Sequence, residues 1–399
     1  MSQAQEPERP DYARRQARFE TALVESGFVA AILLDRRNVF YLTGTGQPCI
    51  LLVVPNHPPI LYARRVAAWV RSEAAVERVE QAASLRPAAG RVRELGLKRG
   101  RIGLELDVIP GRLYLKARES FAEFEIDDVS SMILGARMTK DAFEQHQLRR
   151  SAALFDRLHE TVLESLRPGM REIDVAAEVS RALRRAGHEN ISFYRRWDAC
   201  IQPEGLVVSG SNLARISGLA MTVTGVGLGP ALPWGASERI VQKGDLLVID
   251  LGLNRAGYQA DMSRTYVVGR ADKLTRELFE VVLACQQAAI DAIKPGIPAE
   301  DVYAAALRVV IGTRWEGHFQ GYGTERGRYI GHGVGLDLDE PPVLAVGDTT
   351  RLRVGMALAI EPKLIGPEFG AVQLEDTVFV HDGGAEVISA VPRALFEVG

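Results

Sequence analysis

The chain has 399 residues, and its hydrophobic content of 47% is ample for a compact globule. A chain of this length is too long for one ordinary core, so we expect two domains. The formal net charge of −3 gives no reason to expect nucleic acid or a membrane as a partner. The charged segment 1–20 has no apolar stretch of the kind that forms a signal peptide or a membrane span. Three separated cysteines without a CxxC pair indicate reduced thiols in a cytoplasmic protein.

The first third of the chain alternates short apolar runs with helical stretches, which predicts a mixed α/β domain. Helices are expected over residues 11–26, 66–78 and 87–96, and strands over 29–34, 39–42, 50–54 and 60–62. The proline-rich segment 55–59 is expected to be a hairpin turn. The junction is expected between residues 130 and 140, with Thr139 as the N-cap of the following helix. We therefore predict one domain over residues 1–136 and a second over 137–399.

The second domain contains two similar units, each predicted to be two helices followed by a β-hairpin. Three features recur at matching offsets: an Arg/Lys-Pro-Gly triplet (167–169 and 294–296), an Asp-Val pair (174–175 and 301–302), and a glycine six positions before an acid (Gly244 before Asp250, Gly355 before Glu361). We expect the units to pack as a pseudo-symmetric pair, which would bring both hairpins to one central cleft.

Each predicted hairpin carries two acidic residues. In the first, an apolar run over 246–249 is followed directly by Asp250. A turn is expected over 252–257, and Asp261 comes after it. In the second, a run over 357–360 ends on Glu361, a turn is expected over 366–370, and Glu375 follows. A single acid at a strand end is usually a solvated edge residue or a turn cap. Four acids at matched places behind apolar runs would repel one another, so a bound cation is the simplest explanation.

A fifth candidate, His332, lies in the segment Gly331-His332-Gly333-Val334-Gly335, where glycines allow the ring a close approach to other groups. Carboxylates with one imidazole and no thiolate suit Mn, Co, Fe or Zn in a two-metal hydrolytic site better than a structural zinc. We predict two divalent metal ions on the ligands Asp250, Asp261, His332, Glu361 and Glu375.

Residues 140–395 resemble the pita-bread metallopeptidases, the family of methionine aminopeptidase, aminopeptidase P, prolidase and creatinase. The resemblance rests on the segments 248–252, 257–265, 331–336, 360–362 and 374–377, and segment 38–44 is similar to the N-terminal domain of creatinases and prolidases. The implied fold class is α/β: a creatinase-like N-terminal α/β domain followed by a pseudo-symmetric pita-bread α+β catalytic domain. A homodimer, in which the N-terminal domain restricts access to short substrates, is also implied.

The resemblance also implies roles for the five ligands. Asp250 would chelate the first metal, Asp261 and Glu375 would bridge both metals, and His332 and Glu361 would complete the second. In the family a metal-bridging water is the nucleophile, and the residue that matches Glu361 is the usual candidate for the general base.

Three positions depart from the family pattern. Asp339 stands where prolidases and aminopeptidases P usually carry a histidine, and the segment 232–235 lacks the histidine that usually precedes the first metal-binding Asp. Gln373 replaces an Arg that is often found two positions before the last Glu. We expect Asp339 to meet the substrate in place of an imidazole. The glycine-rich stretch 209–235 is expected to be a loop that shapes the substrate pocket, with Trp234 as an apolar wall.

The remaining histidines offer one more candidate. His318 precedes the predicted metal-binding His332 by a glycine-rich segment and could approach the cleft as a catalytic residue. The others are expected at the surface: His57, His146, His159, His188 and His381.

Two functions remain open at this point. The first is dinuclear metal-dependent hydrolysis of short peptides, as in an Xaa-Pro dipeptidase or an aminopeptidase P. The alternative is a pita-bread relative that acts on a non-peptide small molecule, as a creatinase or a lyase does, and the missing histidines favour it. A non-enzymatic binding protein of this fold is less favoured, because such relatives usually lose the metal ligands.

Overall fold

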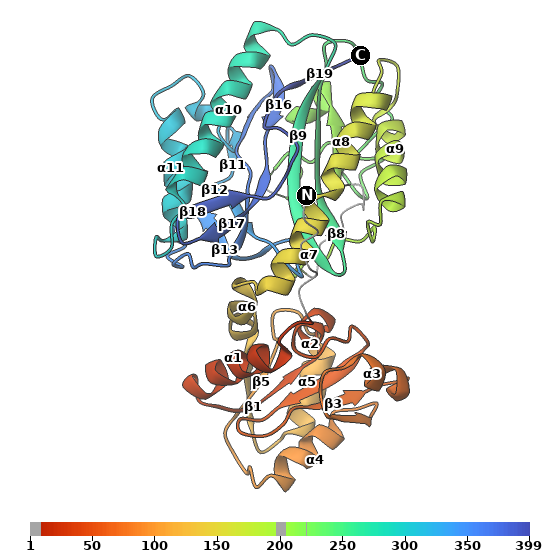
Figure 1. Cartoon of the computed structure of the whole chain (residues 1–399), viewed down its shortest axis with the longest axis vertical. Helices are drawn as coiled ribbons and strands as arrows, with labels where there is room; N and C mark the ends of the chain where they lie inside the picture. The colour runs from red at the N-terminus through yellow and green to blue at the C-terminus, as the bar shows by residue number, and fades with distance from the viewer. Residues whose placement is uncertain (1–8, 197–204, 221) are drawn as a thin grey trace. The chain divides into compact units, whose positions relative to one another are not determined.

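The computed structural model describes residues 9–196, 205–220 and 222–399, which form two compact units (Figure 1). Most of the smaller unit is Arg9–Arg137, and the larger unit begins at Met138. Among the described helices, none combines the length and the apolar character that crossing a bilayer requires.

The smaller unit is built on one mixed sheet. Its elements are α1 (Tyr12–Glu25), β1 (Phe28–Leu33), α2 (Arg36–Thr43), β2 (Cys49–Val53), β3 (Ile60–Ala63), α3 (Ala67–Glu73), β4 (Arg78–Gln81), α4 (Arg86–Glu94), β5 (Arg101–Leu104), α5 (Gly111–Ser120), β6 (Glu125–Asp128) and α6 (Ser130–Met138). The strand order is β4-β3-β2-β1-β5-β6. Ala30 and Ile32 of β1 pack with buried residues of α4 and α5 in one apolar core. The β2–β3 pair is antiparallel, which confirms the predicted hairpin around residues 55–59.

One predicted strand of this unit is wrong, because residues 39–42 belong to helix α2. Asp35 caps this helix by accepting from the backbone N–H groups of Arg37 and Asn38, and Gly44 ends it in the left-handed conformation. A four-residue apolar run is too short for its periodicity to separate a strand from a buried helical turn. The caps at both ends of the segment therefore determine that it is a helix.

The described part of the larger unit contains five α-helices, four of which form two packed pairs, and four sheets. Its elements up to the first hairpin are α7 (Ala142–Ala152), α8 (Leu154–Ser165), α9 (Glu172–Arg185), β7 (Leu206–Ser209), η1 (Gly210–Ala214), β8 (Leu246–Arg255) and β9 (Tyr258–Val268). Then follow α10 (Lys273–Ala292), α11 (Ala299–Val310), η2 (Glu316–His318), β10 (Gly321–Tyr322), β11 (Glu325–Arg326), β12 (Tyr329–Gly333), β13 (Glu340–Ala345), β14 (Ala357–Ile360), β15 (Lys363–Gly366), β16 (Gly370–Gln373), β17 (Asp376–His381), β18 (Gly384–Val387) and β19 (Phe396–Val398). The sheets have the orders β19-β9-β8-β7, β13-β12-β14-β17-β18, β15-β16 and β10-β11.

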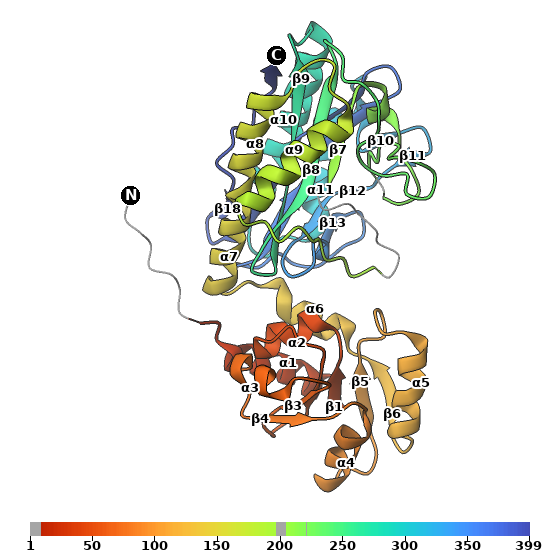
Figure 2. The ribbon, with the colours of Figure 1, turned by 90° about the vertical axis from the view of Figure 1, so that its right-hand side faces the viewer.

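Helices α8 and α9 cover one face of the β8–β9 hairpin (Figure 2). Ile249 and Leu251 of β8 point to this face and join its apolar core, whereas Val248 belongs to the second core, which α10 and α11 also line. Because side chains alternate along a strand, Asp250 points to the same face as Val248, away from α8 and α9. The hairpin thus separates the two helix pairs and directs its acids inward.

The predicted internal repeat is visible in the backbone. Gly169 and Gly296 have φ angles of +94° and +93°, and each donates its N–H over 2.8 Å, to Val241 O and Leu352 O respectively. Gly244 and Gly355 also match, with φ angles of +93° and +88°. All four positions use a conformation that favours glycine. The two halves therefore repeat the same turns, as their spacing predicted.

The turn of the first hairpin differs from the prediction. β8 continues to Arg255, and the turn is the pair Ala256-Gly257, which has φ angles of +52° and +79°. Gly252 lies inside the strand, where a Cβ atom would approach the Leu338 side chain to 2.6 Å. Gly252 thus serves close packing between β8 and Leu338, whereas a glycine read from sequence alone indicates a turn.

The helix that opens the larger unit also corrects a prediction. Asp141, not Thr139, is the N-cap of α7: its carboxylate accepts from the Glu144 N–H at 2.9 Å, and the Glu144 carboxylate accepts from the Asp141 N–H at 3.1 Å. This reciprocal capping box satisfies two backbone donors at once. Thr139 instead pairs with Met356 in an isolated β-bridge.

Two cysteines are buried within the described residues, Cys49 in β2 and Cys285 in α10. Burial, and next to it the Glu73 carboxylate, raise the pKa of Cys49 to about 11, and burial raises the pKa of Cys285 to about 12. Since the thiolate is the reactive form, we expect neither thiol to react with a disulfide reagent at pH 8 in the native protein. Thiol titration of a Cys200→Ser variant, native and in denaturant, measures this, because Cys200 lies outside the described residues. Rapid modification of either thiol before unfolding would contradict the expectation.

Candidate metal centre

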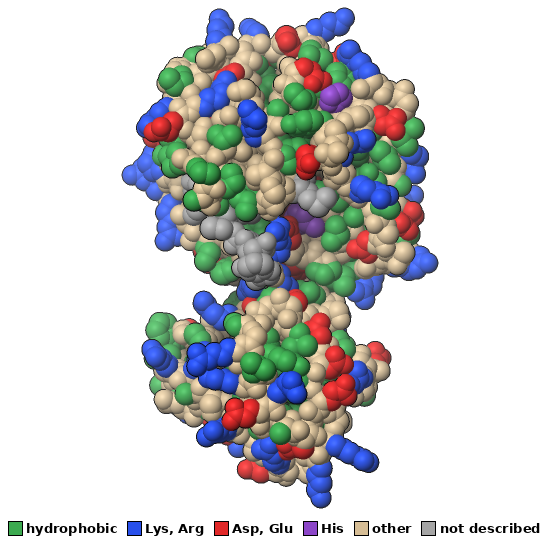
Figure 3. Space-filling view, turned by 180° about the vertical axis from the view of Figure 1, so that it is seen from behind, with side chains coloured by type: hydrophobic (Ala, Val, Ile, Leu, Met, Phe, Trp, Pro, Cys, Tyr) green, Lys and Arg blue, Asp and Glu red, His purple; other side chains and the backbone are tan. Residues whose placement is uncertain are grey.

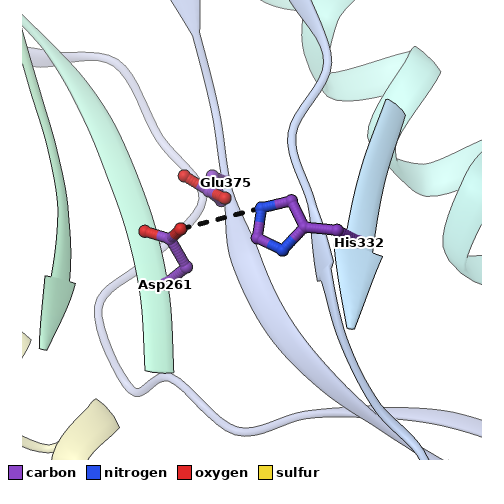
Figure 4. Close-up of side chains that lie close together, drawn as sticks. All are labelled: Asp261, His332 and Glu375. Atoms are coloured by element: carbon purple, nitrogen blue, oxygen red, sulfur yellow. Dashed lines mark ion pairs between the residues drawn. The ribbon is translucent and has the colours of Figure 1, made fainter. Parts of the chain in front are cut away.

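Three of the five predicted ligands converge in the larger unit. One ligand atom from each of Asp261, His332 and Glu375 can be chosen so that all lie within 4.8 Å of one another. Asp261 lies on β9, His332 on β12, and Glu375 directly before β17, and their side chains point toward one another (Figure 4). His332 Nε2 lies 3.8 Å from Asp261 Oδ2.

Strand pairing explains why these distant residues meet. Ser263 of β9 and Glu375 form an antiparallel bridge, in which each N–H donates to the other residue's carbonyl, over 3.3 and 3.2 Å. β17 then pairs with β14, and β14 with β12, where Ala359 faces His332. The hairpin of one half is thus joined to the sheet of the other at the residues that carry the acids.

The other two predicted ligands lie at the side of this cluster. Glu361 follows β14, and its N–H donates to Ile330 O at 2.8 Å. Its Oε1 lies 3.7 Å from His332 Nε2. Asp250 lies on β8, where Oδ2 accepts from Gln373 Nε2 at 2.7 Å. Glu361 therefore contacts His332 of the cluster, and Asp250 contacts both Gln373 and the Glu375 carboxyl group.

The residues present fit a divalent ion. Burial, and after it the Asp250 carboxylate, raise the pKa of Asp261 well above its usual range. Burial and then the Asp261 carboxylate do the same to the pKa of Glu375. Glu375 Oε2 is buried and has no hydrogen-bond partner within the described residues. Buried acids in this state gain from a cation, and hard oxygen donors with one imidazole suit a divalent metal.

His332 lies among acidic side chains. Burial lowers its pKa, but Asp339, Glu361 and Asp261 together raise the pKa to about 9. Asp339 contributes most among the acids, since its Oδ1 lies 3.2 Å from His332 Nε2. As the ligand of a divalent ion, His332 would have to be a neutral imidazole, so this proton would have to leave the ring. Asp339 itself is half-exposed, and this leaves it accessible to a bound substrate.

The segment that carries Asp339 is held by a buried ion pair. Glu340 Oε2 lies 3.1 Å from Lys140 Nζ, and its Oε1 accepts from the Asp337 N–H at 3.0 Å. The Leu338 N–H donates to Phe193 O at 2.7 Å. Asp339 therefore projects from a fixed backbone.

Lys363 is a member of the centre that the sequence reasoning missed. Its ammonium lies 2.5 Å from Glu361 Oε2 and donates to Thr222 Oγ1 at 2.8 Å. Burial lowers the pKa of Lys363, but Glu361, Tyr329 and Asp250 raise it above its ordinary value. The one signal in the sequence is its position two residues after the predicted ligand Glu361, which alone does not separate a buried lysine from an exposed one.

His318 does not join the three-residue cluster. Its Nδ1 lies 3.0 Å from Ile365 O, its Nε2 lies 3.4 Å from the Glu368 carboxylate, and its ring packs against Phe369. These contacts place His318, the last residue of η2, against the β15–β16 hairpin. Its catalytic role stays a prediction that this geometry does not strengthen.

His188, which we expected at the surface, is fully buried. Its Nδ1 accepts from the Asn190 N–H at 3.1 Å, and its Nε2 lies 3.3 Å from Gly252 O, so it supports the back of β8. His159 is half-buried and packs between Tyr266 and Phe396. Trp234, expected to be a pocket wall, is buried in the core that α10 and α11 line.

Charges of both signs lie on one face of the larger unit. On the face drawn in Figure 3, acidic and basic side chains are interspersed over the larger unit. This mixture offers no continuous basic surface for a polyanion.

Comparison with known proteins gives the same division of the chain. Residues 146–382 match the model of metallopeptidase family M24, and residues 15–139 match the Creatinase/Prolidase N-terminal domain. An Xaa-Pro dipeptidase of Pyrococcus furiosus is 32% identical over 282 residues, which cover 70% of each chain. A solved Xaa-Pro dipeptidase from Bacillus anthracis has a TM-score of 0.83 and 25% identity, over 97% of this chain and 100% of the other. The solved dipeptidase PepE from Mycobacterium ulcerans has a TM-score of 0.80 and 26% identity, over 98% and 99%.

Proposed function

This chain belongs to metallopeptidase family M24, and we propose that it hydrolyses short peptides in a metal-dependent reaction, with Xaa-Pro dipeptides as its leading substrates. The resemblance seen in the sequence is confirmed, as is the fold class, a creatinase-like N-terminal domain followed by a pita-bread catalytic domain. The substrate class is supported by the Xaa-Pro dipeptidases among the similar proteins. Homodimer formation, which the resemblance implies, stays a prediction.

The convergence of Asp261, His332 and Glu375 is the observation that carries this proposal. We assign the divalent ion to these three residues, with Asp250 and Glu361 beside them. When bound, such an ion acts as a Lewis acid and generates a nucleophilic water at neutral pH. The donor types favour a class of divalent ions that includes Mn, Co, Fe and Zn, and they do not select one metal within that class.

The remaining tasks fall to side chains of the protein. Glu361 Oε1 faces His332, whereas Oε2 is held by Lys363, so we assign proton transfer to Oε1. The half-exposed Asp339 carboxylate is suited to orient a cationic or hydrogen-bond-donating part of the substrate. A substrate group bound to Asp339 would also release His332 from its ion pair with that carboxylate.

We expect the metal-loaded protein to cleave Xaa-Pro dipeptides and to lose this activity on chelation. Asp339→His is expected to preserve or raise the turnover, because it restores the imidazole that the family usually carries at this position. The measurement is a panel of Xaa-Pro dipeptides, longer Xaa-Pro peptides and small non-peptide amides, assayed with both proteins. Asp382→His, at an exposed acid in the β17–β18 turn, is the matched control.

The same panel also tests the alternative, a non-peptide small molecule as substrate. If the wild type leaves every peptide intact but converts a small amide, and if Asp339→His abolishes that reaction, the peptidase proposal is wrong. Activity that survives complete removal of metal would contradict it as well.

A further inference from the structure

Lys363 places a positive charge inside the candidate metal centre. Its side chain is 1% exposed, and its ammonium lies 2.5 Å from Glu361 Oε2. A second contact, to Thr222 Oγ1 at 2.8 Å, fixes the direction of the ammonium. Because the side chain has almost no contact with solvent, these acceptors take the place of water around the charge.

The backbone of Lys363 is fixed as firmly as its ammonium. Lys363 pairs with Gln373 across the β15–β16 hairpin. Its N–H donates to Gln320 Oε1 at 3.1 Å, and its carbonyl accepts from the Gln320 N–H at 3.0 Å. The ammonium also lies 5.8 Å from the centroid of the Tyr329 ring. The side chain therefore cannot leave the centre without the loss of several contacts.

Gln373, the cross-strand neighbour of Lys363, forms a hydrogen bond with the Asp250 carboxylate. Gln373 Nε2 donates to Asp250 Oδ2 at 2.7 Å. Glu361 and Asp250 thus each have one oxygen satisfied by a nitrogen donor from this hairpin. Glu375 differs from both, because its buried Oε2 has no partner within the described residues. The carboxylate oxygen without a partner thus belongs to the group of Asp261, His332 and Glu375.

We infer that Lys363 replaces one of the two expected metal ions, so that the chain holds a single divalent ion, on Asp261, His332 and Glu375. This inference rests on the proposed metal dependence. Under the ligand roles that the resemblance implies, Asp250 would hold the first of two ions and Glu361 the second, but Gln373 and Lys363 already occupy one oxygen of each carboxylate. The buried ammonium would also repel a second divalent ion, and this repulsion is poorly screened. Lys363 and Gln373 already supply the positive charge and the hydrogen bonds that such an ion would provide to these two carboxylates.

The number of bound ions tests this directly. Stripped wild-type protein, reloaded with Mn²⁺ and freed of excess metal, is expected to retain one ion per chain by elemental analysis. Its electron paramagnetic resonance spectrum is expected to be that of an isolated ion. Lys363→Met, which removes the charge at similar volume, is expected to retain two ions that show spin coupling.

Two further variants complete the experiment. Lys363→Arg keeps the charge and is expected to stay at one ion, whereas Lys294→Met, at an exposed lysine, should match the wild type. If Lys363→Met fails to fold, as judged by circular dichroism, Lys363→Gln takes its place. Two ions in the wild type, or one ion in every folded Lys363 variant, would overturn the inference.

The outcomes also separate this inference from the proposed function. A wild type that cleaves Xaa-Pro dipeptides with two coupled ions leaves the peptidase proposal intact and refutes the role of Lys363. A wild type that binds no divalent ion contradicts both. One ion with no peptide hydrolysis supports the role of Lys363 and counts against the peptide substrate alone.

Discussion

Replacement of Asp261 by Asn is expected to lower the affinity for the divalent ion by at least ~100-fold and to abolish peptide hydrolysis. The change removes a negatively charged donor oxygen from the centre of the cluster, and weakening even the supporting contacts of a metal ligand typically costs 10- to 100-fold in affinity. The backbone should keep its place, because the Asp261 N–H and carbonyl both bond to the Thr377 hydroxyl and do not depend on the side chain.

The same substitution should leave the metal-free protein at least as stable as the wild type. Burial and neighbouring acids raise the pKa of Asp261 well above its usual range, so the charged carboxylate is unfavourable where no cation is bound. Metal titration by calorimetry and thermal unfolding of the stripped protein measure the two effects separately. Asp382→Asn is the matched surface control. Wild-type metal affinity and turnover in Asp261→Asn would show that the ion binds elsewhere.

The positions of the four acids in the fold could be predicted because they depend on spacing that two halves of the chain share, whereas their role as metal ligands stays a prediction. The positions of Gly244 and Gly355 relative to Asp250 and Glu361 recur, and the structure gives both glycines the same backbone conformation. A repeated turn followed by a repeated strand carries its acid to a repeated position. Local patterns of this kind survive in a sequence, since every residue involved lies within a few positions of the next.

Features that depend on distant partners could not be predicted in the same way. Gly252 was interpreted as part of a turn. It is a glycine because the side chain of Leu338, far along the chain, occupies the space that a Cβ atom would need. Lys363 was missed because an isolated lysine ordinarily faces solvent, and only strand pairing brings its ammonium between Glu361 and Thr222. Helix α2 was misread because its caps, not its apolar residues, determine it.

Glu361→Gln is expected to reduce turnover by ~10² to 10⁴, the usual contribution of a positioned general base, while a divalent ion remains bound. Gln keeps an oxygen near His332 but accepts no proton at neutral pH. The metal content should stay close to that of the wild type, because Asp261, His332 and Glu375 are unchanged. Steady-state kinetics with elemental analysis of the same preparation distinguish this from simple loss of the ion.

The ion pair with Lys363 adds a second effect that a general base alone would not produce. Removal of the Glu361 charge leaves a buried ammonium without its closest partner, and breaking a buried pair from one side costs about 3 kcal/mol or more. Stripped Glu361→Gln should therefore unfold at lower denaturant than the wild type. The double variant Glu361→Gln/Lys363→Met removes the unpaired charge and should recover most of this stability without recovering turnover. If the double variant regains activity, Glu361 is not the base, and if it stays as unstable as the single variant, the ammonium does not depend on Glu361.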